Sequence, residues 1–183
     1  MNCLDELKIA LGKYVVTKKE DLIPYLNDAS YFIGNMPEAV VFSGCTEDVI
    51  KIIKIVNKYE IPIVIRGSGT SLTGASILKT NGIVMSMLRM NNILDVSIND
   101  KCVTVEPGVR LDDLERFLDK YGHFYPPDPA SSRSATVGGS ISTNAGGLRG
   151  VAYGATKEWV LGLEVVLADG TLVKLEAKIL KDP

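Results

Sequence analysis

The alternation of short apolar runs with an amphipathic stretch predicts an α/β arrangement in the first half of the chain. Apolar runs at residues 39–42, 63–65 and 83–87 have the length of buried strands. A helix is predicted between the first two, with Thr46 as its N-cap residue. Its apolar face consists of Val49, Ile52, Ile53 and Val56. A strand, a helix and a strand in this order predict a parallel pair with a right-handed crossover.

The remaining patterns predict helices at both ends of this unit and antiparallel strands in the last third. Leucines at helical spacing predict a helix over residues 2–11, within an N-terminal helical extension at 1–35. Trp159 is expected at the start of the final hairpin, with its ring in the core. The other predicted elements are a hairpin of strands 93–98 and 102–105, a helix over 111–121, and a hairpin of strands 159–167 and 172–176. The fold class is therefore predicted to be α+β.

Composition and charge exclude several classes of function. The 183 residues include 20 basic and 22 acidic side chains, and the net charge of −2 argues against nucleic-acid binding. No apolar run approaches the ~20 residues of a transmembrane helix, and the N-terminus lacks the pattern of a signal peptide. Cys3, Cys45 and Cys102 contain no CxxC pair, which predicts reduced thiols in a cytoplasmic protein and no metal site.

The first candidate for ligand chemistry is the Gly-rich segment from Arg66 to Leu72, which directly follows a predicted strand. Glycines at alternate positions allow the backbone N–H groups to surround an anion, and the hydroxyl groups add uncharged donors, which suits a pyrophosphate. A plain Gly-rich turn explains the segment equally well. A Walker loop is disfavoured because no lysine occurs between Arg66 and Lys79, and a Rossmann loop because Leu72 stands where its third glycine would be.

A second Gly-rich stretch covers residues 136–147 and follows the Pro-rich segment at 127–131. Its four glycines occur in two pairs, which would let a planar ligand or another backbone approach closely. Close packing of a short helix on a sheet is the alternative explanation. His123, the only histidine, has no acid or nucleophile arranged beside it in the sequence, so a structural or surface role is expected.

Together these motifs resemble the PCMH-type FAD-binding domain of the FAD-linked oxidase family. The segments at 66–72, 126–131, 136–154 and 159–170 occur in the family's order, and the resemblance extends from about residue 37 to residue 170. Within the family, the branch that contains the flavin-binding chain of glycolate oxidase and D-lactate dehydrogenase is the most similar. The resemblance implies two α/β subdomains that hold FAD between them, the first at about 36–106 and the second at about 107–183.

The resemblance also implies which residues contact FAD. The first loop would bind the pyrophosphate through Arg66, Gly67, Ser68, Gly69, Thr70, Ser71 and Leu72. The second stretch would lie along the flavin and contribute Pro127, Asp128, Ser131, Thr136, Val137, Gly138, Gly139, Ser142, Thr143, Asn144, Gly146 and Tyr153. Some relatives attach FAD covalently through a histidine in the first loop. Thr70 matches that position here, so noncovalent FAD is expected.

The family continues beyond the last hairpin with a further flavin segment, a substrate-binding cap and a late His-rich motif. None of these occurs within residues 1–183, so the fold is expected to be incomplete at its C-terminal side, and no catalytic residue is assigned. Residues 1–183 alone are expected to bind FAD weakly and to show no turnover.

The implied activity is oxidation of a small 2-hydroxy acid, D-lactate or glycolate, by hydride transfer to FAD and then to an unidentified acceptor. Two alternatives stay open: a non-catalytic flavin-binding or electron-transfer subunit, and another reductase of the same superfamily, such as one of cell-wall precursor synthesis. The sequence leaves the substrate, the acceptor and the oligomeric state, a homo-oligomer included, undecided.

Overall fold

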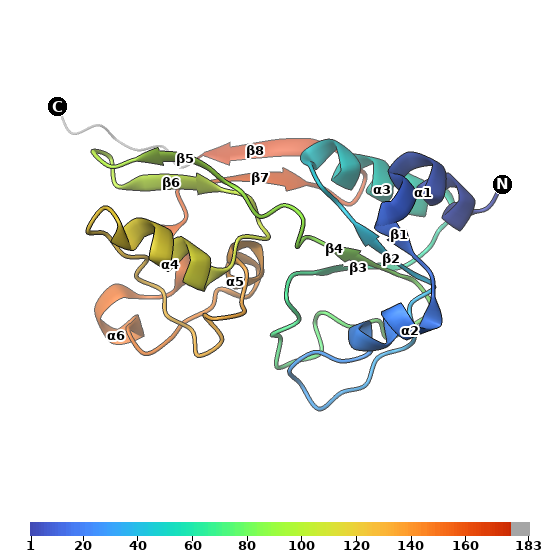
Figure 1. The fold of residues 1–183 in the computed structure, drawn as a ribbon, viewed down its shortest axis with the longest axis horizontal. Helices are drawn as coiled ribbons and strands as arrows, with labels where there is room; N and C mark the ends of the chain where they lie inside the picture. The colour runs from blue at the N-terminus through green and yellow to red at the C-terminus, as the bar shows by residue number, and fades with distance from the viewer. Residues whose placement is uncertain (177–183) are drawn as a thin grey trace.

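A four-stranded sheet forms the centre of the first half of the chain in the computed structural model, which describes residues 1–176 (Figure 1). The strand order is β1-β2-β4-β3. The strands are β1 (Val15–Val16), β2 (Ala39–Phe42), β3 (Ile63–Arg66) and β4 (Ile83–Ser86). Both β2 and β3 pair in parallel with β4, whereas β1 is antiparallel to β2. The predicted parallel orientation of β2 and β3 is thus confirmed, but they are not neighbours, because β4 inserts between them.

Helices α1 (Cys3–Leu11) and α3 (Thr46–Lys58) cover one face of this sheet, as Figure 1 shows. Alternate strand residues point to opposite faces, so Val41 and Met85 pack against these helices, while Val40 and Val84 face the other side. The second face is covered by the segment that contains α2 (Lys19–Leu22), η2 (Ile23–Tyr25) and, further along the chain, Leu78. The N-terminal segment also contributes α1, η1 (Gly12–Tyr14) and β1.

The predicted N-cap of α3 is wrong. Cys45 occupies that position and makes no side-chain capping bond, so the helix begins at Thr46 itself. The Thr46 hydroxyl donates to Glu164 Oε1 at 3.0 Å instead, which links the helix to the last hairpin. Asp48 accepts a hydrogen bond from the Gly44 N–H at 3.0 Å, and its charge suits the positive end of the helix.

The second half of the chain has its own hydrophobic cluster. Strands β5 (Ile93–Ser97) and β6 (Cys102–Val105) form an antiparallel hairpin, and α4 (Leu111–Asp119) packs against it through Leu111, Leu114 and Leu118. Helices α5 (Val137–Thr143) and α6 (Gly150–Tyr153) follow. The subdomain boundary near residue 106 stays a prediction, and the last seven residues of the second predicted subdomain lie outside the described part.

The final hairpin returns to the first half of the chain. Its strands β7 (Gly162–Val166) and β8 (Leu172–Glu176) extend between the β5–β6 hairpin and α3 in Figure 1. Val166 packs against the cluster that contains α3, and Asn57 Nδ2 donates to the Ala168 carbonyl at 2.5 Å. The predicted position of Trp159 is wrong, because it lies in the 3₁₀ helix η3 (Thr156–Trp159) and is 42% exposed.

Among residues 1–176, no helix has both the length and the apolar character needed to cross a membrane.

Candidate cofactor site

The structure brings the two Gly-rich stretches together. A Cβ built on Gly67, in the loop after β3, would lie 2.4 Å from Oγ1 of Thr136, the N-cap residue of α5. Only glycine permits this approach, since ordinary van der Waals contact would require more than 3.4 Å. In Figure 1 the loop that follows β3 faces α5, between the two halves of the chain. The candidate site lies at this junction.

The first loop presents a run of unpaired backbone donors. Within residues 1–176, none of the five successive N–H groups from Ser68 to Leu72 donates a hydrogen bond. Gly69 has a φ of +74°, a conformation that L-residues adopt at a cost. The Ser71 hydroxyl is occupied because it accepts from the N–H groups of Thr73 and Ala75 at 3.2 and 3.1 Å. The backbone of this loop is therefore available to an anionic ligand.

The Arg66 side chain has a different position from the rest of the loop. It is buried, and its guanidinium donates to the carbonyl oxygens of Ser76 at 3.0 Å and Asn27 at 2.8 Å. Burial lowers the pKa of Arg66 from its ordinary value. The guanidinium therefore supports the loop from within the protein.

The start of α5, in contrast, is already occupied. The Val137 N–H donates to the Val109 carbonyl at 2.8 Å, and the Gly138 N–H donates to the Pro107 carbonyl at 2.8 Å. The Gly139 N–H donates to Thr136 Oγ1 at 3.2 Å. These bonds satisfy the first N–H groups of the helix, which would otherwise bind an anion. The first loop, rather than this helix, can thus hold a pyrophosphate.

Several predicted residues of the second stretch have structural contacts. A Cβ on Gly138 would lie 2.6 Å from Pro107 Cβ, so close packing explains this glycine. The hydroxyls of Ser142 and Thr143 donate to carbonyls of their own helix at 2.8 and 3.0 Å. Asn144 ends the helix in a left-handed conformation, and its side-chain oxygen accepts from the Lys157 N–H at 2.9 Å. Short-helix packing therefore describes much of this stretch.

The Pro-rich segment packs beside the same helix. A Cβ on Gly147 would lie 1.7 Å from the Asp128 carbonyl oxygen, which fixes the segment against the end of the Gly-rich stretch. The Asp128 carboxylate lies 3.7 Å from Arg149 Nε. Pro127 and Asp128 line a small cavity of about 190 Å³ together with Arg149.

The remaining predicted residues differ in their surroundings. Pro127 is buried, while Ser131 is half-buried and its carbonyl accepts the Ala135 N–H at 2.7 Å. A Cβ on Gly146 would meet open space. Tyr153 in α6 is 41% exposed and packs with two other exposed aromatic rings, Phe124 at 5.6 Å and Trp159 at 6.4 Å between centroids.

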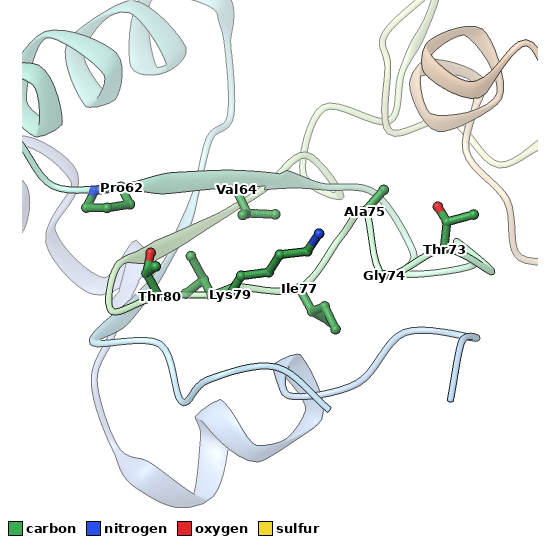
Figure 2. A pocket seen from close by; sticks show the side chains of 9 residues that line it. Pro62, Val64, Thr73, Gly74, Ala75, Ile77, Lys79 and Thr80 are labelled. Carbon is green, nitrogen blue, oxygen red and sulfur yellow. The ribbon is translucent and has the colours of Figure 1, made fainter. Parts of the chain in front are cut away.

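Sequence reasoning missed a cavity of about 410 Å³ beside the first loop. Figure 2 shows it between the edge strand β3, which contributes Val64, and the segment from Thr73 to Thr80, with the Lys79 side chain extending across it. It also missed Pro107 and Val109, whose carbonyls occupy the start of α5. No sequence signal marks carbonyl oxygens, so only the three-dimensional structure could identify them.

These residues fit FAD. The five N–H groups without an acceptor in the described part of the chain, together with the hydroxyls of Ser68 and Thr70, match a negatively charged pyrophosphate. None of residues 68–72 has a negatively charged side chain that would repel it. The contact between Gly67 and Thr136 places the start of α5 next to that loop.

Comparisons with known proteins agree with this site. Residues 37–176 match the family described as an FAD binding domain. Glycolate oxidase subunit GlcD of Bacillus subtilis (strain 168) is 42% identical over 158 residues, which cover 86% of this chain and 34% of that protein. D-lactate dehydrogenase of Anaerostipes hadrus is 40% identical over 179 residues, which cover 97% of this chain and 38% of that protein. The chain thus spans between 34% and 38% of the length of these relatives.

A solved structure gives the same result for the fold. P-cresol methylhydroxylase with substrate bound superposes with a TM-score of 0.80 at 22% identity, over 94% of this chain and 34% of that one. This likeness confirms the predicted α+β, PCMH-type fold. The chain belongs to the FAD-binding domain family, whose cofactor, FAD, is the one predicted from its sequence.

Proposed function

We propose that this chain is the FAD-binding part of an oxidoreductase that oxidises a small 2-hydroxy acid of the D-lactate or glycolate type. The observation that carries the proposal is the run of five N–H groups from Ser68 to Leu72 that have no acceptor within residues 1–176, held next to Thr136. Two relatives with 40% identity or more are named for glycolate and D-lactate, both of which are 2-hydroxy acids. FAD, when bound, supplies the hydride acceptor.

The chain's own residues bind and orient the cofactor in this proposal. The N–H groups from Ser68 to Leu72 bind the pyrophosphate, and the hydroxyls of Ser68 and Thr70 add donors. The flavin lies along the second stretch, where Gly67 against Thr136 fixes the distance between the two loops. The proposed contacts on this side are Pro127, Asp128, Ser131, Thr136, Val137, Gly138, Gly139, Ser142, Thr143, Asn144, Gly146 and Tyr153.

The partners follow from the same proposal. The 2-hydroxy acid would bind in a cap domain or subunit outside residues 1–183, and an acceptor of unidentified kind would take the electrons. A non-catalytic flavin-binding subunit is the second candidate function, because none of residues 1–183 is assigned a catalytic role.

We place the protein in the cytoplasm, on the basis of its three unpaired cysteines.

The bound FAD is expected to be noncovalent, because the first loop contains neither histidine nor cysteine and Thr70 occupies the position of the attachment residue in some relatives. Denaturing the FAD-loaded protein in urea and filtering it should move all the flavin absorbance into the filtrate. The native protein, filtered in parallel, should retain its flavin. Flavin that stays with the unfolded polypeptide would show a covalent bond.

The proposed activity is tested by mixing the full-length, FAD-loaded protein with D-lactate or glycolate in the absence of oxygen. We expect the absorbance of oxidised flavin to disappear with at least one of them. Propionate and acetate, which lack the 2-hydroxyl group, should leave it unchanged. If dithionite reduces the flavin and no 2-hydroxy acid does so, the non-catalytic subunit is the better description.

A further inference from the structure

The charged side chain of Arg66 is buried. Its exposed fraction is 8%, and within residues 1–176 no carboxylate oxygen lies within 4.0 Å of its guanidinium. Its hydrogen bonds go to the neutral carbonyl oxygens of Ser76, Asn27 and, at 3.5 Å, Pro24. Its Cζ lies 5.4 Å from the centre of the Tyr25 ring. Burying a charge is costly unless it is paired, so this arrangement requires a reason.

The guanidinium lies directly behind the Gly-rich loop. A Cβ on Gly69 would be 2.2 Å from Arg66 Nη2 and 2.5 Å from Cζ. Gly69 is the second glycine of the loop, and its N–H is among the five that have no acceptor within residues 1–176. The cation therefore supports the part of the loop that offers donors to an anion. A positive charge directly behind the loop favours an anion bound by the loop's N–H groups.

The N-terminal segment also binds the residues that follow the loop, through the side chain of Asp28. The Asp28 carboxylate accepts from the Ser76 N–H at 3.4 Å and from the Ser76 hydroxyl at 3.1 Å. It also accepts from the N–H and the hydroxyl of Ser30 at 2.9 and 2.6 Å. Burial raises the pKa of Asp28, but these hydrogen bonds outweigh burial and lower it overall. Arg66 and Ser76, which flank the loop, are thus both tied to residues 24–28.

This anchoring segment precedes residues 37–176, the part that matches the FAD-binding family. We propose that Arg66 and Asp28 are positioning residues for the cofactor loop, and that the segment Pro24–Asp28 contributes to FAD binding by holding this loop in place. The proposal rests on the proposed binding of the FAD pyrophosphate by this loop. The segment then keeps the loop in the conformation in which its N–H groups are available to the pyrophosphate. Arg66 adds a positive charge, which the loop backbone lacks.

The test measures the dissociation constants of FAD, ADP and riboflavin for the full-length protein. ADP carries a pyrophosphate without a flavin, and riboflavin carries a flavin without phosphate. Asp28→Asn should weaken FAD and ADP about tenfold, the effect of losing one or two bonds to a charged group, and leave riboflavin unchanged. Removing a negative charge would by itself strengthen anion binding, so a weaker complex indicates positioning. Asp21→Asn, an exposed carboxylate in α2, is the matched control and should change nothing.

Arg66 is tested with two variants. Arg66→Gln should weaken FAD and ADP more than Arg66→Lys, because lysine retains the positive charge. If Arg66→Gln does not fold, the inference is tested with Asp28→Asn and Ser76→Ala instead. Unchanged binding of FAD and ADP in Asp28→Asn would overturn the inference, as would an equal loss of riboflavin, which indicates general damage. If the unaltered protein and Asp21→Asn both fail to bind FAD, the proposed function itself is wrong and this inference falls with it.

Discussion

Replacing Gly69 with alanine is expected to weaken FAD binding about a hundredfold, which corresponds to about 2.7 kcal/mol. The backbone at Gly69 has a φ of +74°, a region that costs an L-residue about 1–2 kcal/mol. The new Cβ would also lie 2.2 Å from Arg66 Nη2, and Arg66 is held by carbonyl oxygens on its far side. The loop must therefore move, and its five N–H groups lose their arrangement. Titration of FAD into the full-length variant, followed by flavin fluorescence, measures the effect.

Gly122→Ala is the matched control for this prediction. Gly122 has nearly the same backbone angle, a φ of +70°, but a Cβ there would meet no atom within 4 Å. The two variants share the backbone strain and differ in the clash with Arg66. We expect Gly122→Ala to lower the melting temperature slightly and to bind FAD normally. Equal FAD affinity in the two variants would show that the loop after β3 is not the pyrophosphate site.

The second large effect is expected at the junction of the two loops. Gly67→Ala would place a Cβ 2.4 Å from Thr136 Oγ1 and force the first loop away from α5. Since FAD is proposed to contact both sides, we expect its affinity to fall about tenfold or more, which is about 1.4 kcal/mol or more. The measurement is again an FAD titration, together with thermal unfolding of the FAD-free protein.

A double-mutant cycle identifies the contact responsible. Thr136→Ala removes Oγ1 and Cγ2, and the remaining Cβ lies at 3.4 Å, which is ordinary contact. Alanine also loses the capping bond to the Gly139 N–H, at a cost of about 1 kcal/mol. Gly67→Ala should therefore harm FAD binding less in the Thr136→Ala protein, whereas Thr136→Val keeps the bulk and should give no relief. Additive effects in Thr136→Ala would contradict a direct contact.

Local sequence patterns predicted the elements of this fold well but not all of their neighbours. The strands predicted at 39–42 and 63–65 were recognised as short apolar runs, and the helix between them because burial on one face imposes a repeat that the sequence displays. The insertion of β4 between β2 and β3 depends on long-range pairing, which no local pattern encodes. Thr46 was misassigned for a similar reason, since its hydroxyl bonds to Glu164, far along the chain.

The location of the candidate site was predictable from the sequence, but the roles of its individual residues were less so. The glycines at 67 and 69 indicated a loop with special backbone geometry, and the structure gives each a specific neighbour, Thr136 and Arg66. The sequence could not distinguish glycines kept for a ligand from those kept for packing, such as Gly138 against Pro107. The residue-level cofactor contacts stay predictions. The anchoring role of Asp28 was missed because it depends on a residue 48 positions away.

Amide hydrogen exchange tests the central claim most directly, because the proposed donors are backbone N–H groups. The full-length protein is compared with and without saturating FAD, and exchange is followed for peptides that cover residues 66–72. The N–H groups from Ser68 to Leu72 have no acceptor within residues 1–176, so they should exchange fast without FAD. Their exchange should slow down when the pyrophosphate binds them. The turn of the β5–β6 hairpin should exchange at the same rate in both states. Unchanged exchange at residues 66–72 in protein shown to contain FAD would contradict the account.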